Sequence, residues 1–271
     1  MPPPIDRIRL LEDIGADAWP AATTAWLEGW RLSLDAGVTR RANSVLPNAA
    51  QPVGGADALI GEVERRYRAR GLCPCFKLTA AAAPADLDRR LERRGYRSEG
   101  QSLVLVADAR AIAPPHAPKV AIALDDRPTR AWLDACWPAA PYAAERSARQ
   151  AIVERVRLPR AFALARLEAA LAGAALAVAD RGWVGITAVH TLPEQRRRGV
   201  AQCLLGALAG WATEQGIERL YLQVERDNAP ARRLYGGLGF TEAYSYHYRR
   251  AGRSPISSAR AAAQRGTRRS L

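Results

Sequence analysis

The chain has 271 residues, of which 48% are hydrophobic, enough for one large domain or two of ordinary size. Its formal net charge of +13 and isoelectric point of about 10.4 favour anionic partners such as nucleic acid, an acidic membrane or a phosphorylated cofactor. No stretch approaches the roughly 20 apolar residues of a membrane span, and the N-terminal segment lacks a signal-peptide run, so we expect a cytoplasmic protein without a membrane partner.

Residues 1–110 alternate helical and extended patterns. Residues 58–71 have helical spacing and end in glycine, and residues 72–79 are extended. A second helical segment, 84–96, ends in Gly-Tyr, and residues 102–108 follow as an apolar strand. These patterns predict a small α/β unit at the N-terminus.

A proline-rich passage at 111–118 predicts a linker, and a longer α/β region, residues 119–250, follows it. A hairpin turn is expected at Asp180-Arg181-Gly182. Residues 251–271 have no aromatic and few bulky aliphatic side chains, which predicts a disordered basic tail. The expected strands of the region are 119–125, 161–168, 169–179, 183–192, 218–225 and 240–249, and its expected helices are 127–137, 143–156, a segment that begins after Gly199, and 229–239.

The two parts of the chain share an order of elements. In each, a helix ending in glycine precedes a strand, and a second helix ending in glycine and an aromatic residue precedes another strand. This repetition indicates a tandem architecture with a partial repeat. An unrelated α/β cap at the N-terminus is the alternative.

The four cysteines do not have the spacing of a metal site. Cys73 and Cys75 are separated by one residue, whereas common zinc and redox motifs place two residues between their cysteines. Neither Cys136 nor Cys203 forms a second pair, and no nearby histidine completes a set. We therefore expect buried, reduced thiols and no metal.

The segment QRRRGVA, residues 195–201, lies where an expected strand ends and an expected helix begins. The free N–H groups and the dipole of a helix N-terminus attract an anion. Gly199 allows close approach of the backbone to a phosphate, Ala201 leaves room for it, and the arginines add charged hydrogen-bond donors. The segment therefore predicts a pyrophosphate site, although a solvent-exposed turn is the simpler alternative.

Two motifs in this region resemble those of one known family. Arg196-x-x-Gly199-x-Ala201 is similar to the Q/R-x-x-G-x-G/A signature of the GNAT superfamily of acyl-CoA-dependent N-acetyltransferases. The segment from Asn228 to Phe240 is similar to the N-x-x-A-x-x-L-Y-x-x-x-G-F motif of the same superfamily. The resemblance implies an α/β (α+β) GNAT fold, a mixed central sheet flanked by helices. It also implies that the N-terminal part is a degenerate, partial GNAT-like module without the phosphate loop.

The resemblance implies acetyl-CoA as co-substrate. Backbone groups near the start of the helix, together with arginine side chains, would hold the pyrophosphate. Backbone near Thr191 and Leu192 would pair with the pantetheine arm, and Asn228 would contact that arm from the other side, unless it only caps the next helix. The residues expected at the cofactor are Thr191, Leu192, Arg196, Arg197, Arg198, Gly199, Val200, Ala201, Gln202 and Asn228.

Catalytic roles follow from the same resemblance. Tyr235 is similar in position to the general acid that protonates the departing thiolate, and the ordinary phenol pKa of about 10 suits that transfer. Glu225 and His190 are alternative bases for deprotonating the attacking amine, and a water relay is a third possibility. Arg40, Arg41 and Asn43 are candidate acceptor contacts, and a solvent-exposed strand is the simpler alternative.

The expected function is transfer of an acetyl group from acetyl-CoA to a primary amine of a small metabolite, amino acid or peptide. The alternatives are a nucleic-acid-binding protein and a CoA-sensing interaction protein without catalysis. The net charge permits nucleic-acid binding, but the sequence has no recognition helix and no aromatic RNA-binding motif. The partners expected are therefore acetyl-CoA and an amine, with the protein a monomer or a homodimer.

Overall fold

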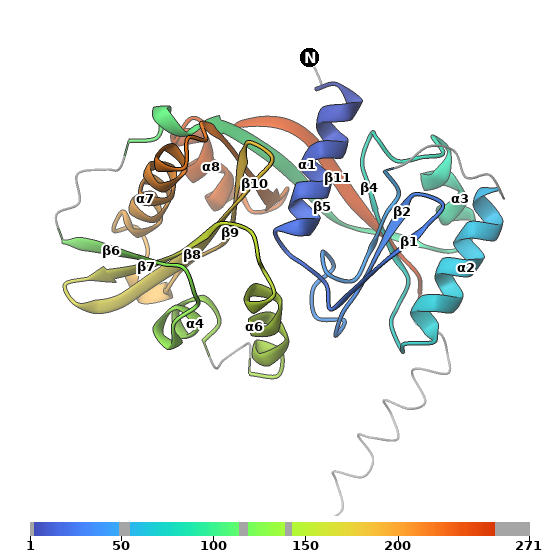
Figure 1. Ribbon diagram of the computed structural model, residues 1–271, viewed down its shortest axis with the longest axis horizontal. Helices are drawn as coiled ribbons and strands as arrows, with labels where there is room; N and C mark the ends of the chain where they lie inside the picture. The colour runs from blue at the N-terminus through green and yellow to red at the C-terminus, as the bar shows by residue number, and fades with distance from the viewer. Residues whose placement is uncertain (1–2, 49–54, 114–118, 139–142, 253–271) are drawn as a thin grey trace, which may run out of the picture.

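In the computed structural model, residues 3–48, 55–113, 119–138 and 143–252 are described. Within these residues, eleven strands form one mixed sheet in the order β1-β2-β3-β4-β11-β5-β10-β9-β8-β7-β6 (Figure 1). The predicted linker at 111–118 and the predicted tail at 251–271 fall largely outside the described ranges. The prediction of a mixed sheet flanked by helices is confirmed.

The elements of the N-terminal half begin with a helix and a hairpin that the sequence patterns had not indicated. The hairpin between β1 and β2 turns at Glu28 and Gly29, which both have positive φ, as a tight two-residue turn requires. The expected helix-strand-helix-strand series follows it. The elements are α1 (Ile5–Asp17), β1 (Thr23–Leu27), β2 (Trp30–Leu34), β3 (Val45–Leu46), α2 (Ala56–Arg68), β4 (Cys75–Leu78), α3 (Leu87–Arg93) and β5 (Arg97–Asp108).

The elements of the C-terminal half agree with the predicted order. The turn at Asp180-Arg181-Gly182 is present, with positive φ at Arg181 and Gly182. The elements are β6 (Val120–Asp125), α4 (Arg130–Cys136), α6 (Arg146–Glu154), β7 (Arg160–Leu167), β8 (Ala170–Asp180), β9 (Trp183–Thr191), α7 (Val200–Glu214), β10 (Arg219–Glu225), α8 (Ala229–Gly237) and β11 (Thr241–Arg250), with short 3-10 helices at Ala109–Ala111 and Pro193–Gln195.

The last strand of each half lies beside a strand of the other half. β5 is the end of the N-terminal repeat, yet it pairs antiparallel with β10 on one side and with β11 on the other. β11 in turn lies between β5 and β4 and pairs antiparallel with both. The two repeats are therefore joined through exchanged strands in one continuous sheet.

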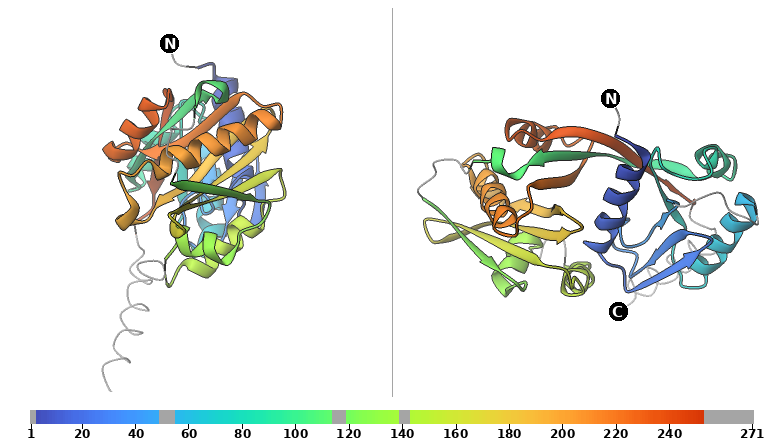
Figure 2. Two further views of the ribbon diagram at one scale, coloured as in Figure 1. Left: turned by 90° about the vertical axis from the view of Figure 1, so that its left-hand side faces the viewer. Right: turned by 45° about the horizontal axis from the view of Figure 1, so that its top comes forward.

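Helices cover both faces of the sheet, and apolar side chains fill the layers. In the C-terminal half, α7 and α8 lie on one face, and α4 and α6 on the other (Figures 1 and 2). The predicted apolar face of α7 is confirmed, because Leu204, Leu205, Leu208 and Ala212 are all buried against the sheet. α1 packs on the middle of the sheet through Ile8, Leu11 and Ile14, in a cluster that also contains residues of β4, β5, β10 and β11.

Candidate active site

The adjacent parallel strands β9 and β10 separate part-way along their length. They pair only from Val184 to Ile186 and from Leu220 to Leu222. Beyond these residues β9 continues beside β8, and β10 continues beside β5. The sheet therefore opens between its two central parallel strands, at their carboxyl ends.

A β-bulge bends β9 where the opening begins. On β9, Ala188 and Val189 stand opposite the single residue Ala175 of β8, and Ala188 has a φ of +54°. The irregularity places Val189 against the α7 side of the sheet and Ala188 against the α4 side. The bulge therefore interrupts the regular ladder at these two residues, and the Ala188 carbonyl accepts from Cys136 Sγ over 3.4 Å.

The predicted phosphate loop lies between β9 and α7. Arg197 and Gly199 have φ values of +59° and +79°, and Gly199 caps the N-terminus of α7. The first hydrogen bond of the helix runs from Cys203 N to Gly199 O, so the N–H groups of Val200 and its two successors have no acceptor within the helix. A helix end with free N–H groups of this kind can bind an anion.

The three arginines of this loop are exposed around the start of α7. The Arg196 Nε atom lies 3.5 Å from the backbone oxygen of Thr191, which links the loop to the end of β9. Arg198 donates to the Gln195 side chain over 2.9 Å. Because Leu192 N donates to Ala172 O over 3.0 Å, the chain stays attached to β8 up to the loop.

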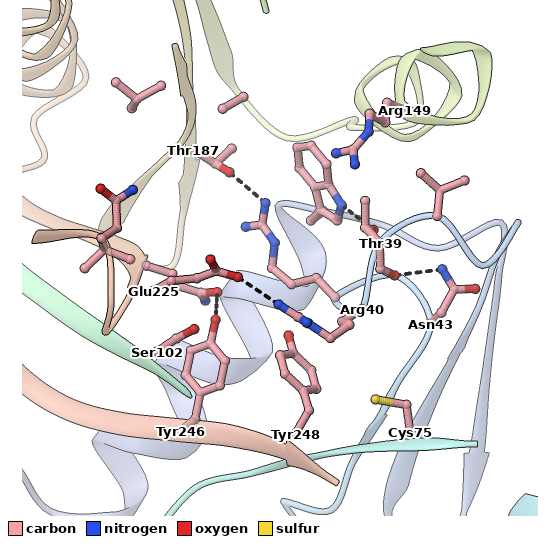
Figure 3. Close-up of a pocket in the computed structure, with 18 of the residues that line it drawn as sticks. Thr39, Arg40, Asn43, Cys75, Ser102, Arg149, Thr187, Glu225, Tyr246 and Tyr248 are labelled. Atoms are coloured by element: carbon pink, nitrogen blue, oxygen red, sulfur yellow. Dashed lines mark hydrogen bonds and ion pairs between the residues drawn. The ribbon is translucent and has the colours of Figure 1, made fainter. Parts of the chain in front are cut away.

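A cavity of about 610 Å³ lies where β9 and β10 separate (Figure 3). Both halves of the chain line it, because the segment Gly37–Asn43 and the strand β11 face the separated ends of β9 and β10. Of the predicted site residues, Glu225, Asn228 and Tyr235 line the cavity, whereas His190 and the loop residues 191–202 do not. The structure thus brings the predicted acid and one predicted base to the same cavity.

Tyr235 extends from α8 into the wall of this cavity. Its side chain is buried beside Phe240, with ring centroids 5.9 Å apart. Among the described residues its hydroxyl has no hydrogen-bond partner. Burial raises the pKa of Tyr235 to about 12, which is further from the pKa of a thiol than the ordinary phenol value of about 10. The phenol is therefore protonated at working pH, and its strength as an acid is reduced.

Glu225 ends β10 and is held by an arginine from the other half. Arg40 Nη2 donates to Glu225 Oε1 over 2.8 Å, and Arg40 also lies 3.7 Å from the Glu99 carboxylate. The Glu225 side chain is 64% exposed. A proton taken up at this carboxylate can therefore pass directly to solvent.

His190, the second candidate base, does not line the cavity. It pairs with Ala174 of β8, on the face that packs toward α4. Its Nε2 atom is buried without a hydrogen-bond partner among the described residues. Burial, with a smaller effect from the Arg196 charge, lowers the pKa of His190.

Asn228 and Asn43 both have structural hydrogen bonds. Asn228 caps α8, because its side-chain oxygen accepts from Ala231 N over 3.2 Å, and its amide nitrogen remains available for a ligand. Asn43 accepts from the N–H groups of Asp35 and Gly37 and donates to Thr39 O. Asn43 therefore shapes the loop that carries Arg40 and Arg41, a role that its expected contact with the acceptor did not include.

Within the described ranges, all four cysteines are free, and Cys75, Cys136 and Cys203 are buried. The same part of the chain contains no group of three or more His, Cys, Asp or Glu side chains arranged to hold a metal ion. It also contains no helix long and apolar enough to cross a membrane.

Comparison with known proteins assigns this fold to a family. The family model described as "Probable histone acetyltransferase Rv0428c C-terminal" matches residues 6–249. The chain belongs to this family. YobR of Bacillus subtilis (strain 168), described as an uncharacterized N-acetyltransferase, is 30% identical to this GNAT protein over 249 residues, which are 90% of this chain and 99% of YobR. The expected membership of the GNAT superfamily is thus confirmed.

Solved structures of other GNAT proteins share the fold of this protein over most of its length. A GCN5-related N-acetyltransferase from Kribbella flavida superposes with a TM-score of 0.70 at 16% identity, covering 93% of this chain and 97% of its own. A tandem GNAT protein from the clavulanic acid biosynthesis pathway superposes with a TM-score of 0.64 at 14% identity, covering 90% and 88%. The expected tandem architecture is confirmed, and the protein is an N-acetyltransferase of GNAT type.

Proposed function

We propose that this GNAT protein transfers an acetyl group from acetyl-CoA to a primary amine of a small metabolite, amino acid or peptide. The observation that carries the proposal is the joint position of two features on β9. The strand separates from β10 after Ile186, and the loop that follows its end at Thr191 leads into the arginine-flanked N-terminus of α7. Acetyl-CoA bound with its thioester in this opening would place its pyrophosphate at the N-terminus of α7.

In this proposal the donor binds along β9. The N–H groups of Val200, Ala201 and Gln202, with the loop around Gly199, would hold the pyrophosphate. The side chains of Arg196, Arg197 and Arg198 would add charge-assisted hydrogen bonds. Backbone of Thr191 and Leu192 would pair with the pantetheine arm, and the free amide of Asn228 would contact the arm from α8.

The chemistry is direct acyl transfer. The uncharged amine attacks the thioester carbonyl carbon, a backbone N–H at the bulge of β9 stabilises the developing oxyanion, and the carbon–sulfur bond breaks. Tyr235 would donate a hydrogen bond, and finally a proton, to the departing thiolate. We assign the base to Glu225 in preference to His190, because Glu225 lines the cavity and reaches solvent.

The test is calorimetric titration with acetyl-CoA of the unaltered protein and of the double variant Arg198→Glu, Gly199→Glu. The expected result is binding in the micromolar range that the double variant abolishes, because two carboxylates would face the phosphates. Arg110→Glu is the control for reversing the charge of a single arginine, since Arg110 is an exposed arginine outside the cavity. Absence of binding by the unaltered protein, or equal binding by the double variant, would overturn the proposed donor site.

A further inference from the structure

The cavity has a cationic lining. Four arginines and one glutamate are its charged residues, namely Arg40, Arg41, Arg149, Arg250 and Glu225. Three of the arginines have carboxylate neighbours. Arg40 pairs with Glu225, Arg250 lies 3.8 Å from Glu99, and Arg149 donates to Glu145 over 2.7 Å.

Arg41 differs from these three. Among the described residues, no carboxylate lies within 4 Å of its guanidinium group. One nitrogen, Nη2, donates to Thr187 Oγ1 over 2.9 Å, and the group lies over the ring of Trp19, 4.4 Å from the centroid. The indole of Trp19 is itself fixed by donation to Thr39 over 3.1 Å. Arg41 is therefore a half-buried, oriented cation with most of its donors unused.

This cation lies at the point where acetyl transfer would occur. Thr187 is the first residue of β9 beyond its last pair with β10, and it directly precedes the bulge at Ala188. Glu225 lies on β10 beyond the same last pair. Figure 3 shows Thr187 and Glu225, each bonded to an arginine, at the cavity wall. A partly buried guanidinium favours a planar anion that accepts two hydrogen bonds, and a carboxylate has that geometry.

We propose that the acceptor is a free amino acid whose carboxylate is bound by Arg41 and whose amino group is directed at the thioester beside Glu225. The inference rests on the proposed acetyl transfer and narrows its substrate class. In a protein lysine or at a peptide N-terminus the α-carboxyl group is part of a peptide bond, so neither would offer its own α-carboxylate to Arg41. A free amino acid places the two groups within one small molecule.

The experiment compares free amino acids with their carboxamides. Release of CoA from acetyl-CoA is measured for a panel of free amino acids, for the carboxamides of the same amino acids, and for lysine-containing peptides with blocked N-termini. The unaltered protein is expected to prefer the acids. Arg41→Gln is expected to raise KM for the best acid roughly 10- to 100-fold while KM for acetyl-CoA is kept, because charge-assisted hydrogen bonds are lost. Arg41→Lys should recover part of the loss.

The matched control is Arg219→Gln. Arg219 also lies over a tryptophan, 5.3 Å from the ring of Trp183, but it does not line this cavity. The Arg219→Gln variant should keep the preference for free amino acids over their carboxamides. Equal turnover of acids and carboxamides by the unaltered protein, or an Arg41→Gln variant that loses both equally, would overturn the inference while acetyl transfer stands. Turnover of the peptides instead would assign a protein acceptor, and no turnover of any amine would overturn the proposed function as well.

Discussion

Arg40 of the N-terminal half donates a hydrogen bond to Glu225, 185 residues later in the chain, over 2.8 Å. The Arg40 guanidinium also lies 5.2 Å from the ring centroid of Tyr248 on β11. Both partners of the ion pair are partly exposed, with side-chain exposures of 37% and 64%, so the pair contributes little to stability. The ion pair instead holds the Glu225 carboxylate in place, because Arg40 of the N-terminal half contacts it at the end of β10.

The first prediction concerns Arg40. Arg40→Met should lower kcat about 10-fold, since Glu225 would no longer be held at the cavity, and misplacement of a catalytic group is costly. KM for acetyl-CoA should be kept, and the free energy of unfolding should change by less than about 1 kcal/mol. Steady-state kinetics and urea denaturation measure these quantities. Arg110→Met, which removes exposed ion pairs to Asp108 and Glu218, is the control, and an equal loss of kcat in that variant would contradict a positioning role.

The second prediction separates the two candidate bases. Glu225→Gln should lower kcat about 100-fold, the usual effect of removing a general base. His190→Gln should have a small effect, because His190 does not line the cavity. Its lowered pKa means that the ring is already neutral above about pH 6.5, so the variant should leave the pH profile unchanged from pH 7 upward. A larger loss in the His190 variant would reverse the assignment.

Local patterns in the sequence predicted much of the fold, but they did not predict the contacts between the two halves. The apolar spacing from Leu204 to Ala212 gave α7, and Asp180-Arg181-Gly182 gave a turn, because both depend on neighbouring residues. α1 and the hairpin of β1 and β2 were not predicted. The exchange of β5 and β11 could not be predicted, because a strand pattern does not specify its partner.

The same distinction holds at the site. The motif residues near Gly199 and Tyr235 are close in sequence to the elements that position them, so a signature could find them. Arg41 and Thr187 are 146 residues apart, and neither belongs to a motif. Their contact depends on how the two halves pack. From the sequence alone, Arg41 was only one of several candidate acceptor contacts.

The third prediction concerns Tyr235. Tyr235→Phe should lower kcat by about 10- to 100-fold, because the thiolate would lose its proton donor, and should keep acetyl-CoA affinity, because packing on Phe240 is preserved. Because burial raises the pKa of Tyr235 to about 12, the phenol remains protonated as pH rises, and no alkaline loss of activity from this group is expected below about pH 11. Calorimetry and a pH–rate profile provide the measurements. Unchanged turnover in the variant would exclude Tyr235 as the acid.

The fourth prediction follows from the exchanged strands. β5 has β10 on one side and β11 on the other, so neither half keeps its full set of strand neighbours alone. The chain should therefore unfold in one cooperative transition, with far-UV circular dichroism and tryptophan fluorescence coinciding. Leu32→Ala and Leu176→Ala form a matched pair, because both side chains are fully buried, one in each half.

Each of these two substitutions should lower the free energy of unfolding by about 2–5 kcal/mol, the cost of a cavity in a packed core. In a shared sheet, each should shift the whole transition seen by both probes. If Leu32→Ala instead shifts one transition and Leu176→Ala shifts another, the halves are independent folding units despite the strand exchange. In that case residues 1–110 and 119–271, produced separately, should also fold, whereas a single cooperative unit predicts that neither does.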